Sequence, residues 1–311
     1  MPFSAMANFY LNTSPHQNSE HISLRARKQF ARLLFAIAVL IFHSISIAQK
    51  CDVLPVERSI PDGKGCLTVW WPKGFDAEGL DPTIKVDNRV LVVLLHGDSA
   101  GGLAQRHIDR WARAARILTE PTQPTVFLVR PGYSSPVGDS SGWANQRDDD
   151  YTAENVQRVA TALKNLKAHY KASKLLLIGH SGGAAIGALL LGFHPDALDG
   201  AVLLGCPCDV PNWRQHRSIQ RGRQTPWPNS LNPMDAIAQI PTSKVVLAIT
   251  GSMDDNTLPK FAQSWIDAAR ARGVDAKFIL AIDQDHSNII LWPELRQHIK
   301  QTINHLTERS P

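Results

Sequence analysis

Ser181 stands in a local pattern that could expose a nucleophile. Residues 179–183 read Gly-His-Ser-Gly-Gly, which fits G-x-S-x-G; they follow an apolar run at 174–178 and open a segment of small residues. A serine on a tight turn from strand to helix is exposed and lies close to the backbone N–H groups of the helix N-terminus. The pattern therefore predicts that Ser181 attacks a carbonyl carbon.

His286 is the candidate base, because a serine hydroxyl is a poor nucleophile without one. It lies in a polar loop, Asp-Gln-Asp-His-Ser at 283–287, just beyond the last apolar run of the chain. Ligands bind at the carboxyl edge of a parallel sheet, where such loops lie. An imidazole there could take the proton of Ser181 and return it to a leaving group.

Two neighbouring carboxylates could orient that imidazole and stabilise its cationic form. Residues 250–257 read Thr-Gly-Ser-Met-Asp-Asp-Asn-Thr and follow another apolar run. Asp254, third after the glycine, is preferred, and Asp255 stays open as the alternative.

An oxyanion hole requires two N–H donors aimed at the developing negative charge. Gly182, directly after the nucleophile, is expected to supply one of them. The second is expected from the loop at 96–102, with the Asp98 backbone preferred and Ser99 as the alternative. Six residues in or beside these motifs, or in a Trp- and Arg-rich segment, are candidates for contact with substrate: His96, Ser99, Tyr133, His180, Trp213 and Arg214.

Short apolar runs alternate with helical patterns, which predicts a mostly parallel, doubly wound α/β sheet with helices on both faces. The expected strands are 89–95, 125–129, 174–178, 201–204, 244–249 and 277–282, after a leading hairpin at 67–71 and 83–86. The expected helices are 153–170, 182–193, 258–272 and 289–306. Residues 207–240 are too long for a simple connection and are interpreted as a small cap over the site.

The first 48 residues read as a targeting region. A basic stretch precedes ten apolar residues at 33–42, and Ser46 and Ala48 stand at positions −3 and −1 before Gln49. This is the layout of a signal peptide, with a retained membrane anchor as the alternative. We therefore expect residues 49–311 to form an exported α/β domain, periplasmic or extracellular, with no stable membrane span after cleavage.

Composition and charge exclude several classes of protein. The chain has 311 residues, 43% of them hydrophobic and 20% charged, which excludes disordered, collagenous and coiled-coil proteins. The formal net charge is +5, and it falls to about +2 without the first 48 residues. That excess is too small to indicate a nucleic-acid partner.

All four cysteines follow the expected cleavage site, and an even number in an exported protein suggests disulfides. Cys51 and Cys66 enclose a short loop, and a bridge there would stabilise the edge of the domain. Cys206 and Cys208 are separated by one residue, so free thiols and a labile bond both stay open. Two cysteines without a suitably spaced histidine do not indicate a metal site.

Four segments give the chain, from about residue 67 to 306, a resemblance to the α/β-hydrolase superfamily. They are LLHGDSAGG at 94–102, IGHSGGA at 178–184, GSMDDNT at 251–257 and DQDHSN at 283–288. The order Ser181, Asp254, His286 is that of the superfamily. The resemblance implies acyl transfer to water through an acyl-serine, with no cofactor or metal. The Asp-Asp-Asn-Thr run looks like the acid loop of prolyl-oligopeptidase-type members, where the first Asp serves. We expect no propeller like that of those enzymes, and the loop at 96–102 departs from the HGGG form of some lipases at Asp98.

The leading hypothesis is a secreted or periplasmic serine hydrolase that cleaves small carboxylic esters. One alternative keeps the same three residues in a peptidase that acts on short peptides, with cap arginines binding a peptide carboxylate. Another is a binding protein that keeps the fold without catalysis. The oligomeric state stays open.

Overall fold

The computed structural model describes residues 51, 59–70, 89–99, 102–119, 123–142, 151–222 and 229–309. They all belong to one compact unit, Ala48–Pro311. The apolar run at 33–42 and the expected strand at 83–86 lie outside the described residues.

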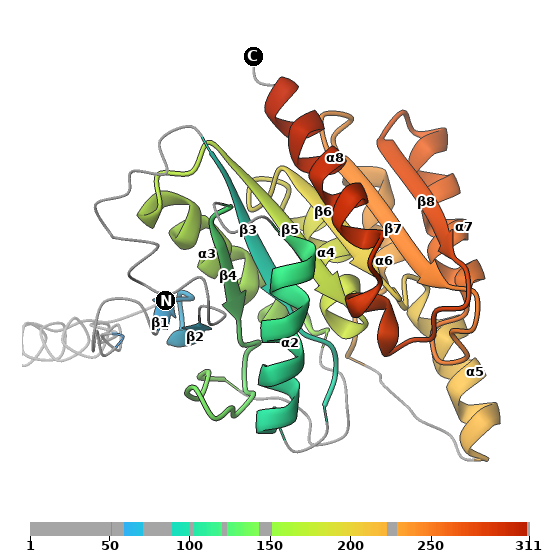
Figure 1. Ribbon diagram of the computed structural model, residues 1–311, viewed down its shortest axis with the longest axis horizontal. Coiled ribbons are helices and arrows are strands. Elements are labelled where there is room, and N and C mark those ends of the chain that lie inside the picture. The colour runs from blue at the N-terminus through green and yellow to red at the C-terminus, as the bar shows by residue number, and fades with distance from the viewer. Residues whose placement is uncertain are drawn as a thin grey trace, which may run out of the picture. The chain divides into compact units, whose positions relative to one another are not determined.

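Eight strands form one sheet in the order β1-β2-β4-β3-β5-β6-β7-β8 (Figure 1). The strands from β4 to β8 in that order are parallel, whereas β2 runs antiparallel to β4 and β1 antiparallel to β2. This confirms the predicted mostly parallel α/β sheet. The strands are β1 (Ser59–Pro61), β2 (Cys66–Trp70), β3 (Val90–Leu95), β4 (Thr125–Leu128), β5 (Lys174–His180), β6 (Gly200–Leu204), β7 (Val245–Gly251) and β8 (Asp275–Ala281).

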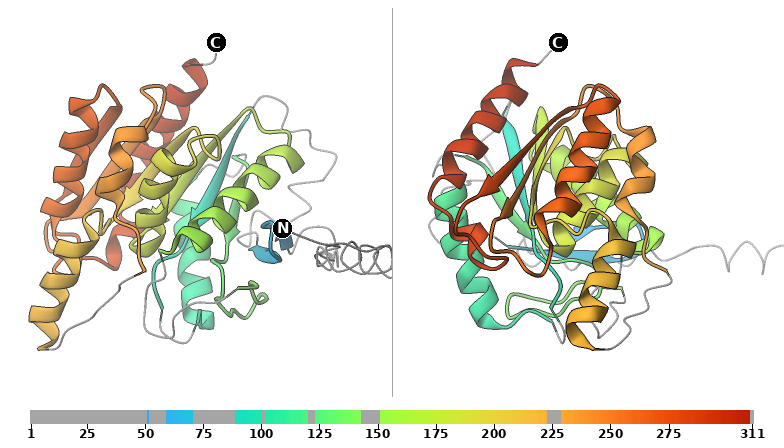
Figure 2. Two further views of the ribbon diagram at one scale, coloured as in Figure 1. Left: turned by 180° about the vertical axis from the view of Figure 1, so that it is seen from behind. Right: turned by 90° about the vertical axis from the view of Figure 1, so that its right-hand side faces the viewer.

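Helices cover both faces of this sheet (Figure 2). One face packs against α3 (Ala153–His169), α4 (Gly182–Phe193) and α7 (Pro259–Ala271), and the other against α2 (Gln105–Leu118) and α8 (Leu295–Glu308). Within the described residues, no helix is both long and apolar enough to cross a membrane.

The central strand β3 shows why the apolar runs become buried parallel strands. Its odd-numbered residues, Leu91, Val93 and Leu95, pack in the core under α3 and α4. Its even-numbered residues pack in the core under α2 and α8. Side chains of a strand alternate between the two faces, so a strand covered on both sides must be apolar throughout. Each fully buried Val or Leu contributes about 2 kcal/mol.

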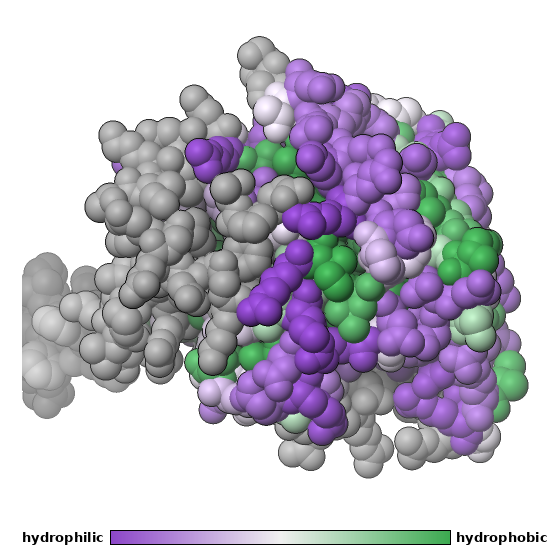
Figure 3. Space-filling view, in the orientation of Figure 1, coloured by the Kyte–Doolittle hydropathy of each residue, from purple (hydrophilic) through white to green (hydrophobic). Residues whose placement is uncertain are grey.

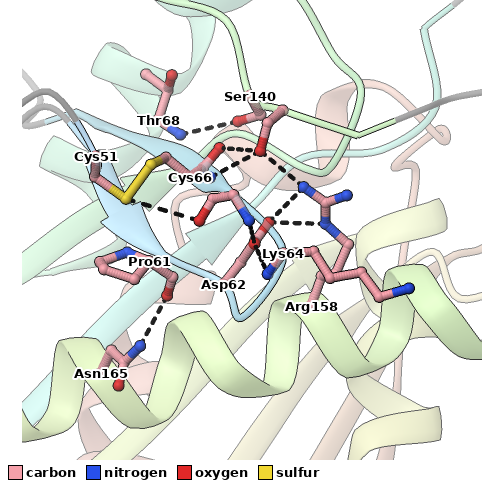
Figure 4. The surroundings of a disulfide bond; sticks show 11 residues. Cys51, Pro61, Asp62, Lys64, Cys66, Thr68, Ser140, Arg158 and Asn165 are labelled. Atoms are coloured by element: carbon pink, nitrogen blue, oxygen red, sulfur yellow. Dashed lines mark hydrogen bonds and ion pairs between the residues drawn. A yellow bond between two sulfur atoms is a disulfide. The ribbon is translucent and has the colours of Figure 1, made fainter. Parts of the chain in front are cut away.

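The antiparallel edge differs from the expected hairpin, because β2 pairs with β1. The turn between them depends on Asp62, whose Oδ1 accepts hydrogen bonds from the N–H groups of Lys64 and Gly65 at 2.9 and 2.7 Å. Arg158 of α3 donates from Nε to Asp62 Oδ2 at 2.8 Å (Figure 4). Strand β1 has only three residues, which is too short a run to predict from the sequence. The ion pair between Asp62 and α3 is a tertiary contact, which a local pattern does not show.

The helix expected at 289–306 is in fact two elements. A 3-10 turn, η2 (Asn288–Leu291), is followed by α8, which begins at Leu295. Pro293 lies between them. Proline lacks an N–H donor and pushes the preceding residue, Trp292, out of the helical region, to a ψ of 122°.

Helix α2 was not predicted from the sequence. Ile108, Trp111, Ala115 and Leu118 form its buried stripe, at the spacing of a helix that packs on one face. The region interpreted as a cap contains α5 (Val210–Arg221), α6 (Pro233–Ala236) and the 3-10 turn η1 (Ile237–Gln239).

Both candidate cysteine pairs are bonded, Cys51 to Cys66 and Cys206 to Cys208. The first joins positions 15 residues apart and fixes residue 51 against β2 (Figure 4). The second lies in the connection from β6 to α5, and both of its cysteines are buried.

Removing the Cys51–Cys66 bond is expected to destabilise the protein. A bridge that closes a loop of this length restricts the unfolded chain and contributes about 3 kcal/mol. The double variant Cys51→Ala/Cys66→Ala should therefore lose about that much free energy of unfolding in urea. Equal stability of the variant and the parent protein would contradict the prediction.

Candidate active site

Three side chains from separate loops meet at the carboxyl ends of the strands, the edge to which the arrowheads point in Figure 1. Ser181 follows β5, Asp254 follows β7 and His286 follows β8. His286 Nε2 lies 3.0 Å from Ser181 Oγ, and its Nδ1 lies 2.9 Å from Asp254 Oδ2. The structure thus brings together the three residues that the sequence pattern singled out.

The turn that carries Ser181 is strained. Ser181 has φ 53° and ψ −119°, in a region that residues other than glycine rarely occupy. Its N–H donates to the Leu204 carbonyl oxygen at 2.8 Å, which holds the turn against β6. The flanking glycines are required by space: a Cβ on Gly179 would lie 2.4 Å from the Gly183 oxygen, and one on Gly183 would lie 2.3 Å from the Leu95 oxygen.

The carboxylate of Asp254 is buried and fully engaged. Its Oδ1 accepts from the N–H groups of Asn256 and Thr257 at 3.0 and 2.7 Å, and its Oδ2 accepts from the Thr257 hydroxyl at 2.8 Å. Burial acts to raise the pKa of Asp254, but hydrogen bonds from His286 and Thr257 outweigh it and hold that pKa below its ordinary value. The carboxylate therefore stays ionised next to the imidazole.

The alternative carboxylate, Asp255, does not reach His286. It is exposed, and its backbone oxygen accepts hydrogen bonds from His216 Nε2 at 2.7 Å and Gln220 Nε2 at 2.9 Å, both on α5. The structure thus pairs Asp254 with the histidine and uses the backbone of Asp255 to attach α5.

Thr257 is a positioning residue that the sequence analysis did not single out. Its hydroxyl lies 2.8 Å from Asp254 Oδ2 and 3.0 Å from His286 Nδ1, and its side chain is fully buried. An aspartate side chain often accepts hydrogen bonds from backbone N–H groups that follow it closely in sequence, in an Asx turn. The Asp-Asp-Asn-Thr spacing could have indicated that Thr257 lies beside the carboxylate of Asp254.

Replacing Thr257 by valine is expected to lower kcat/KM by about tenfold to a hundredfold. Valine has the same shape but loses a hydrogen bond to an ionised group, worth about 1.5 to 3 kcal/mol. Steady-state kinetics of Thr257→Val and Thr257→Ser provide the measurement. The serine variant keeps the hydroxyl and should retain most of the activity; equal losses in both variants would argue against this role.

The two expected oxyanion donors belong to segments that pack against each other beside Ser181. Gly182 is the first residue of α4, where the backbone N–H has no partner within the helix. A Cβ on Gly182 would lie 2.1 Å from Asp98 Oδ1, and one on Gly97 would lie 2.8 Å from Ser181 Cβ, so the 96–99 loop packs directly on the turn.

The side chain of Asp98 anchors that loop. Its Oδ1 lies 2.7 Å from Arg130 Nη1, and its Oδ2 accepts from the Tyr151 hydroxyl at 2.7 Å. The Arg130 side chain is only 2% exposed, so this ion pair is buried and has both charges hydrogen-bonded. The aspartate that replaces a glycine of the lipase loop thus gives the backbone at Asp98 a fixed position.

The buried side chain of His96 supports the 96–99 loop. It is 1% exposed, its Nε2 accepts the Arg130 backbone N–H at 2.9 Å, and its Nδ1 donates to the Gly97 oxygen at 2.7 Å. These two bonds fix one neutral tautomer and use both ring nitrogens. His96 borders the cavity, but neither nitrogen is available to a substrate.

His180, directly before the nucleophile, holds the loop of the candidate base. Its Nε2 donates to the His286 backbone oxygen at 2.7 Å, and the two rings pack with centroids 4.9 Å apart. Burial, together with the neighbouring imidazole of His286, lowers the pKa of His180 from 6.5 to about 3. His180 is therefore neutral in the folded protein near neutral pH.

Stability is expected to fall on mild acidification because of this buried histidine. The unfolded chain takes up a proton near pH 6.5, whereas the folded protein does so only near pH 3. The stability conferred by the neutral ring is thus complete above about pH 6.5 and is lost as the pH falls toward 3. Between pH 7.5 and 5, the free energy of unfolding should drop by about 1 to 2 kcal/mol for His180 alone.

Urea unfolding of the parent protein and His180→Gln at both pH values checks this expectation. Glutamine can donate the same hydrogen bond but does not titrate, so its variant should show a shallower pH dependence. The same slope in both proteins would contradict the assignment to His180.

The remaining predicted contacts divide into two groups. Ser99, Trp213 and Arg214 line the cavity in front of Ser181, together with His180. Tyr133 does not; it is 4% exposed and packs edge-on against His96, with centroids 4.7 Å apart. The expected substrate contact of Tyr133 is thus replaced by a supporting role behind the loop.

The cavity has a volume of about 480 Å³, within the usual range for small-molecule sites. It lies between α2 and α5, with Ser181 and His286 on its wall. Helix α2 supplies five side chains that the sequence analysis missed: Arg106, His107, Arg110, Trp111 and Arg113.

The strand order and the strained serine turn define an α/β-hydrolase, and comparisons with solved structures agree. An esterase from Pyrococcus furiosus superposes with a TM-score of 0.59 at 14% identity, over 80% of this chain and 89% of its own. A proline iminopeptidase from Mycobacterium smegmatis gives 0.54 at 15% identity, over 81% and 98%. An esterase from Pyrobaculum calidifontis gives 0.54 at 15% identity, over 80% and 83%. At these identities the likeness shows the fold alone.

The family follows from the sequence itself. A model of the prolyl oligopeptidase family matches residues 140–307, more than half of the chain. The chain belongs to the prolyl oligopeptidase family, and it is a hydrolase of the esterase and S9 peptidase type. No curated protein matches it.

Proposed function

We propose that this protein hydrolyses small carboxylic esters through an acyl-serine intermediate, with Ser181 as nucleophile, His286 as general base and acid, and Asp254 as the orienting carboxylate. The observation that carries the proposal is the continuous chain of contacts from Asp254 Oδ2 through His286 to Ser181 Oγ, at 2.9 and 3.0 Å. Such a chain moves a proton away from the serine as its oxygen attacks.

In the first half of the reaction, Ser181 Oγ forms a bond to the carbonyl carbon while His286 Nε2 takes the hydroxyl proton. The carbonyl oxygen becomes an oxyanion, which the N–H groups of Gly182 and Asp98 stabilise. His286 then gives its proton to the alcohol oxygen as the carbon–oxygen bond breaks. The ionised Asp254 stabilises the imidazolium that exists in between.

In the second half, water takes the place of the alcohol. His286 accepts a proton from the water as its oxygen attacks the acyl carbon, and the proton returns to Ser181 Oγ when the acid leaves. The same donors serve both tetrahedral intermediates. Water is the second substrate, and the proton transfers and oxyanion contacts in both halves are assigned to residues of the chain.

The lining of the cavity supports an ester substrate over a peptide bound by its amino terminus. Among the described lining residues, the one carboxylate is Asp98, which is ion-paired with Arg130. A peptide ammonium would need an acidic partner, and arginines in the wall would repel it. An uncharged or anionic ester meets no such obstacle.

The family match supports a second candidate, a peptidase acting on short peptides. The same three residues could acylate on an amide, with His286 protonating the leaving amine. In that case the arginines of the cavity would bind the peptide's carboxylate.

Two measurements test the proposal. A fluorophosphonate probe should label the parent protein and leave Ser181→Ala unlabelled; a folded parent protein that resists labelling would point to a binding protein. Matched 4-nitrophenyl esters and 4-nitroanilides of the same acyl groups then separate the two activities. We expect ester turnover with kcat/KM above about 10⁴ M⁻¹s⁻¹ and no detectable amide cleavage. Comparable anilide turnover would favour the peptidase.

We also propose that the protein is exported after cleavage before Gln49. The basic and apolar residues of the first 48 positions support this, and so do two disulfides, which persist in oxidising compartments. Fractionation of cells that produce the full chain, with N-terminal sequencing of the product, is the test. Mature protein in the soluble exported fraction, starting at Gln49, is expected; an intact N-terminus in the membrane fraction would indicate a retained anchor.

A further inference from the structure

Arginine side chains dominate the wall of the cavity that contains Ser181. Among its described lining residues, five are arginines: Arg106, Arg110, Arg113, Arg214 and Arg221. The single described carboxylate in the wall, Asp98, is already neutralised by Arg130 at 2.7 Å. The arginines therefore give the described wall an excess of positive charge.

Three of these arginines lie on one face of α2. Spacings of four and three residues, from Arg106 to Arg110 and on to Arg113, place their side chains above one another on a helix. Figure 3 shows strongly hydrophilic residues along this helix. Arg106 and Arg113 are exposed, and neither is ion-paired within the part of the chain that the structure describes.

The middle arginine ties this stripe to the loop of the candidate base. Arg110 Nη2 contacts the Ser287 backbone oxygen and donates to Asn288 Oδ1 at 3.2 Å. Asp285 is the carboxylate that interacts with Arg110. Arg110 is thus engaged by the protein, while Arg106 and Arg113 flank it one turn away on each side, beside the same cavity.

The opposite wall holds a fourth guanidinium in a fixed orientation. Arg214 of α5 is only 8% exposed, and its guanidinium carbon lies 3.9 Å from the centroid of the Trp213 ring. Trp213 is itself held by its indole N–H, which donates to the Asn256 oxygen at 3.1 Å. A guanidinium stacked on an indole is held in place, so Arg214 adds a fixed positive charge to this wall of the cavity.

We propose that the substrate carries an anionic group, a carboxylate or phosphate, and that Arg106 and Arg113 of α2 are specificity-determining residues that bind it. This inference rests on the proposed ester hydrolysis at Ser181. The cluster attracts an anionic ester from solution and holds its charged end between α2 and α5 while the carbonyl group lies against Ser181.

Matched ester pairs provide the test in the protein as it exists. One pair carries the charge on the acyl side, 4-nitrophenyl hydrogen adipate against 4-nitrophenyl hexanoate. The other carries it on the leaving group, 4-carboxyphenyl butyrate against 4-carbamoylphenyl butyrate. The anionic member of at least one pair should show a kcat/KM about tenfold above its neutral partner, with an advantage that shrinks as salt is added.

Variants of the arginines on α2 test whether these residues cause the preference for anionic esters. Arg106→Gln/Arg113→Gln should bring that ratio to about one, by lowering kcat/KM of the anionic ester about tenfold relative to that of its neutral partner. The control Arg116→Gln/Arg270→Gln removes the same charge from α2 and α7 outside the cavity and should keep the preference. No preference in either pair, or a preference that the cavity variant and the control share equally, would overturn the inference.

Binding without turnover separates this inference from the proposed function. Calorimetric titration of Ser181→Ala with glutarate and with inorganic phosphate measures anion affinity directly, and it also shows which oxyanion is preferred. Weaker binding of at least one anion, by about fivefold, after the additional Arg106→Gln/Arg113→Gln change supports the site even if no ester is hydrolysed. If neither anion binds, or the added change alters neither affinity, the anion site is wrong while labelling of Ser181 still stands.

Discussion

Ser181→Ala is expected to lower kcat for the best ester substrate by about 10⁵- to 10⁶-fold. The alanine variant loses the atom that forms the acyl bond, and His286 has no hydroxyl to deprotonate. What little rate remains would come from the oxyanion donors and from substrate binding.

The comparison isolates chemistry from folding, because alanine occupies the same left-handed backbone conformation, at φ 53°, with the same strain. Thermal unfolding of Ser181→Ala should therefore match that of the parent protein. Steady-state and burst kinetics with a 4-nitrophenyl ester give the rates. Residual activity above about one per cent would mean that another residue forms the acyl-enzyme.

Asp254→Asn is expected to reduce kcat by about 10⁴-fold with little change in the fold. The amide oxygen can still accept from Thr257, which directs the amide nitrogen toward His286 Nδ1. Donation from that nitrogen would force the imidazole to carry its proton on Nε2, where it faces Ser181 and cannot accept. The imidazolium would also lose its negative neighbour.

Asp255→Asn is the matched control, since it makes the same change one residue away on an exposed side chain. Its kcat should stay within about twofold of the parent value. Should Asp255→Asn be the damaging variant and Asp254→Asn nearly silent, the pairing of carboxylate and histidine would have to be reassigned. Structures of both variants would show whether the loop had moved.

The triad positions could be read from the sequence because each depends on local geometry. Glycine is required at positions 179 and 183 because a Cβ there would collide with backbone atoms of the same turn or of the end of β3. Each functional residue then follows a buried apolar run, and parallel strands bring their carboxyl ends to one edge. Short-range patterns of this kind survive in a single sequence.

The contacts that fix the oxyanion loop could not be read in the same way. Arg130 and Asp98 are 32 residues apart and meet only because β3 and β4 are neighbours. Neither the partner of a buried arginine nor the inward position of Tyr133 follows from periodicity. Both depend on how loops pack after the sheet has formed.

Helix α2 was missed for a different reason. Its apolar stripe, with Ile108, Trp111 and Leu118, has the correct spacing, but arginines dominate the rest of the segment. A search for apolar runs passes over such a helix, whereas a search for periodicity would detect it. The omission matters here because α2 carries the arginines on which substrate selection is proposed to depend.

The left-handed turn at Ser181 also bears on how this chain could change over time. Glycine adopts this backbone conformation without steric strain, so the residue that would be most stable at this position is one that cannot perform the reaction. Selection for robustness alone would erode the nucleophile, and selection for turnover keeps the fold less stable than it could be. Tolerance of further mutation must then come from the densely packed cores on both faces of the sheet.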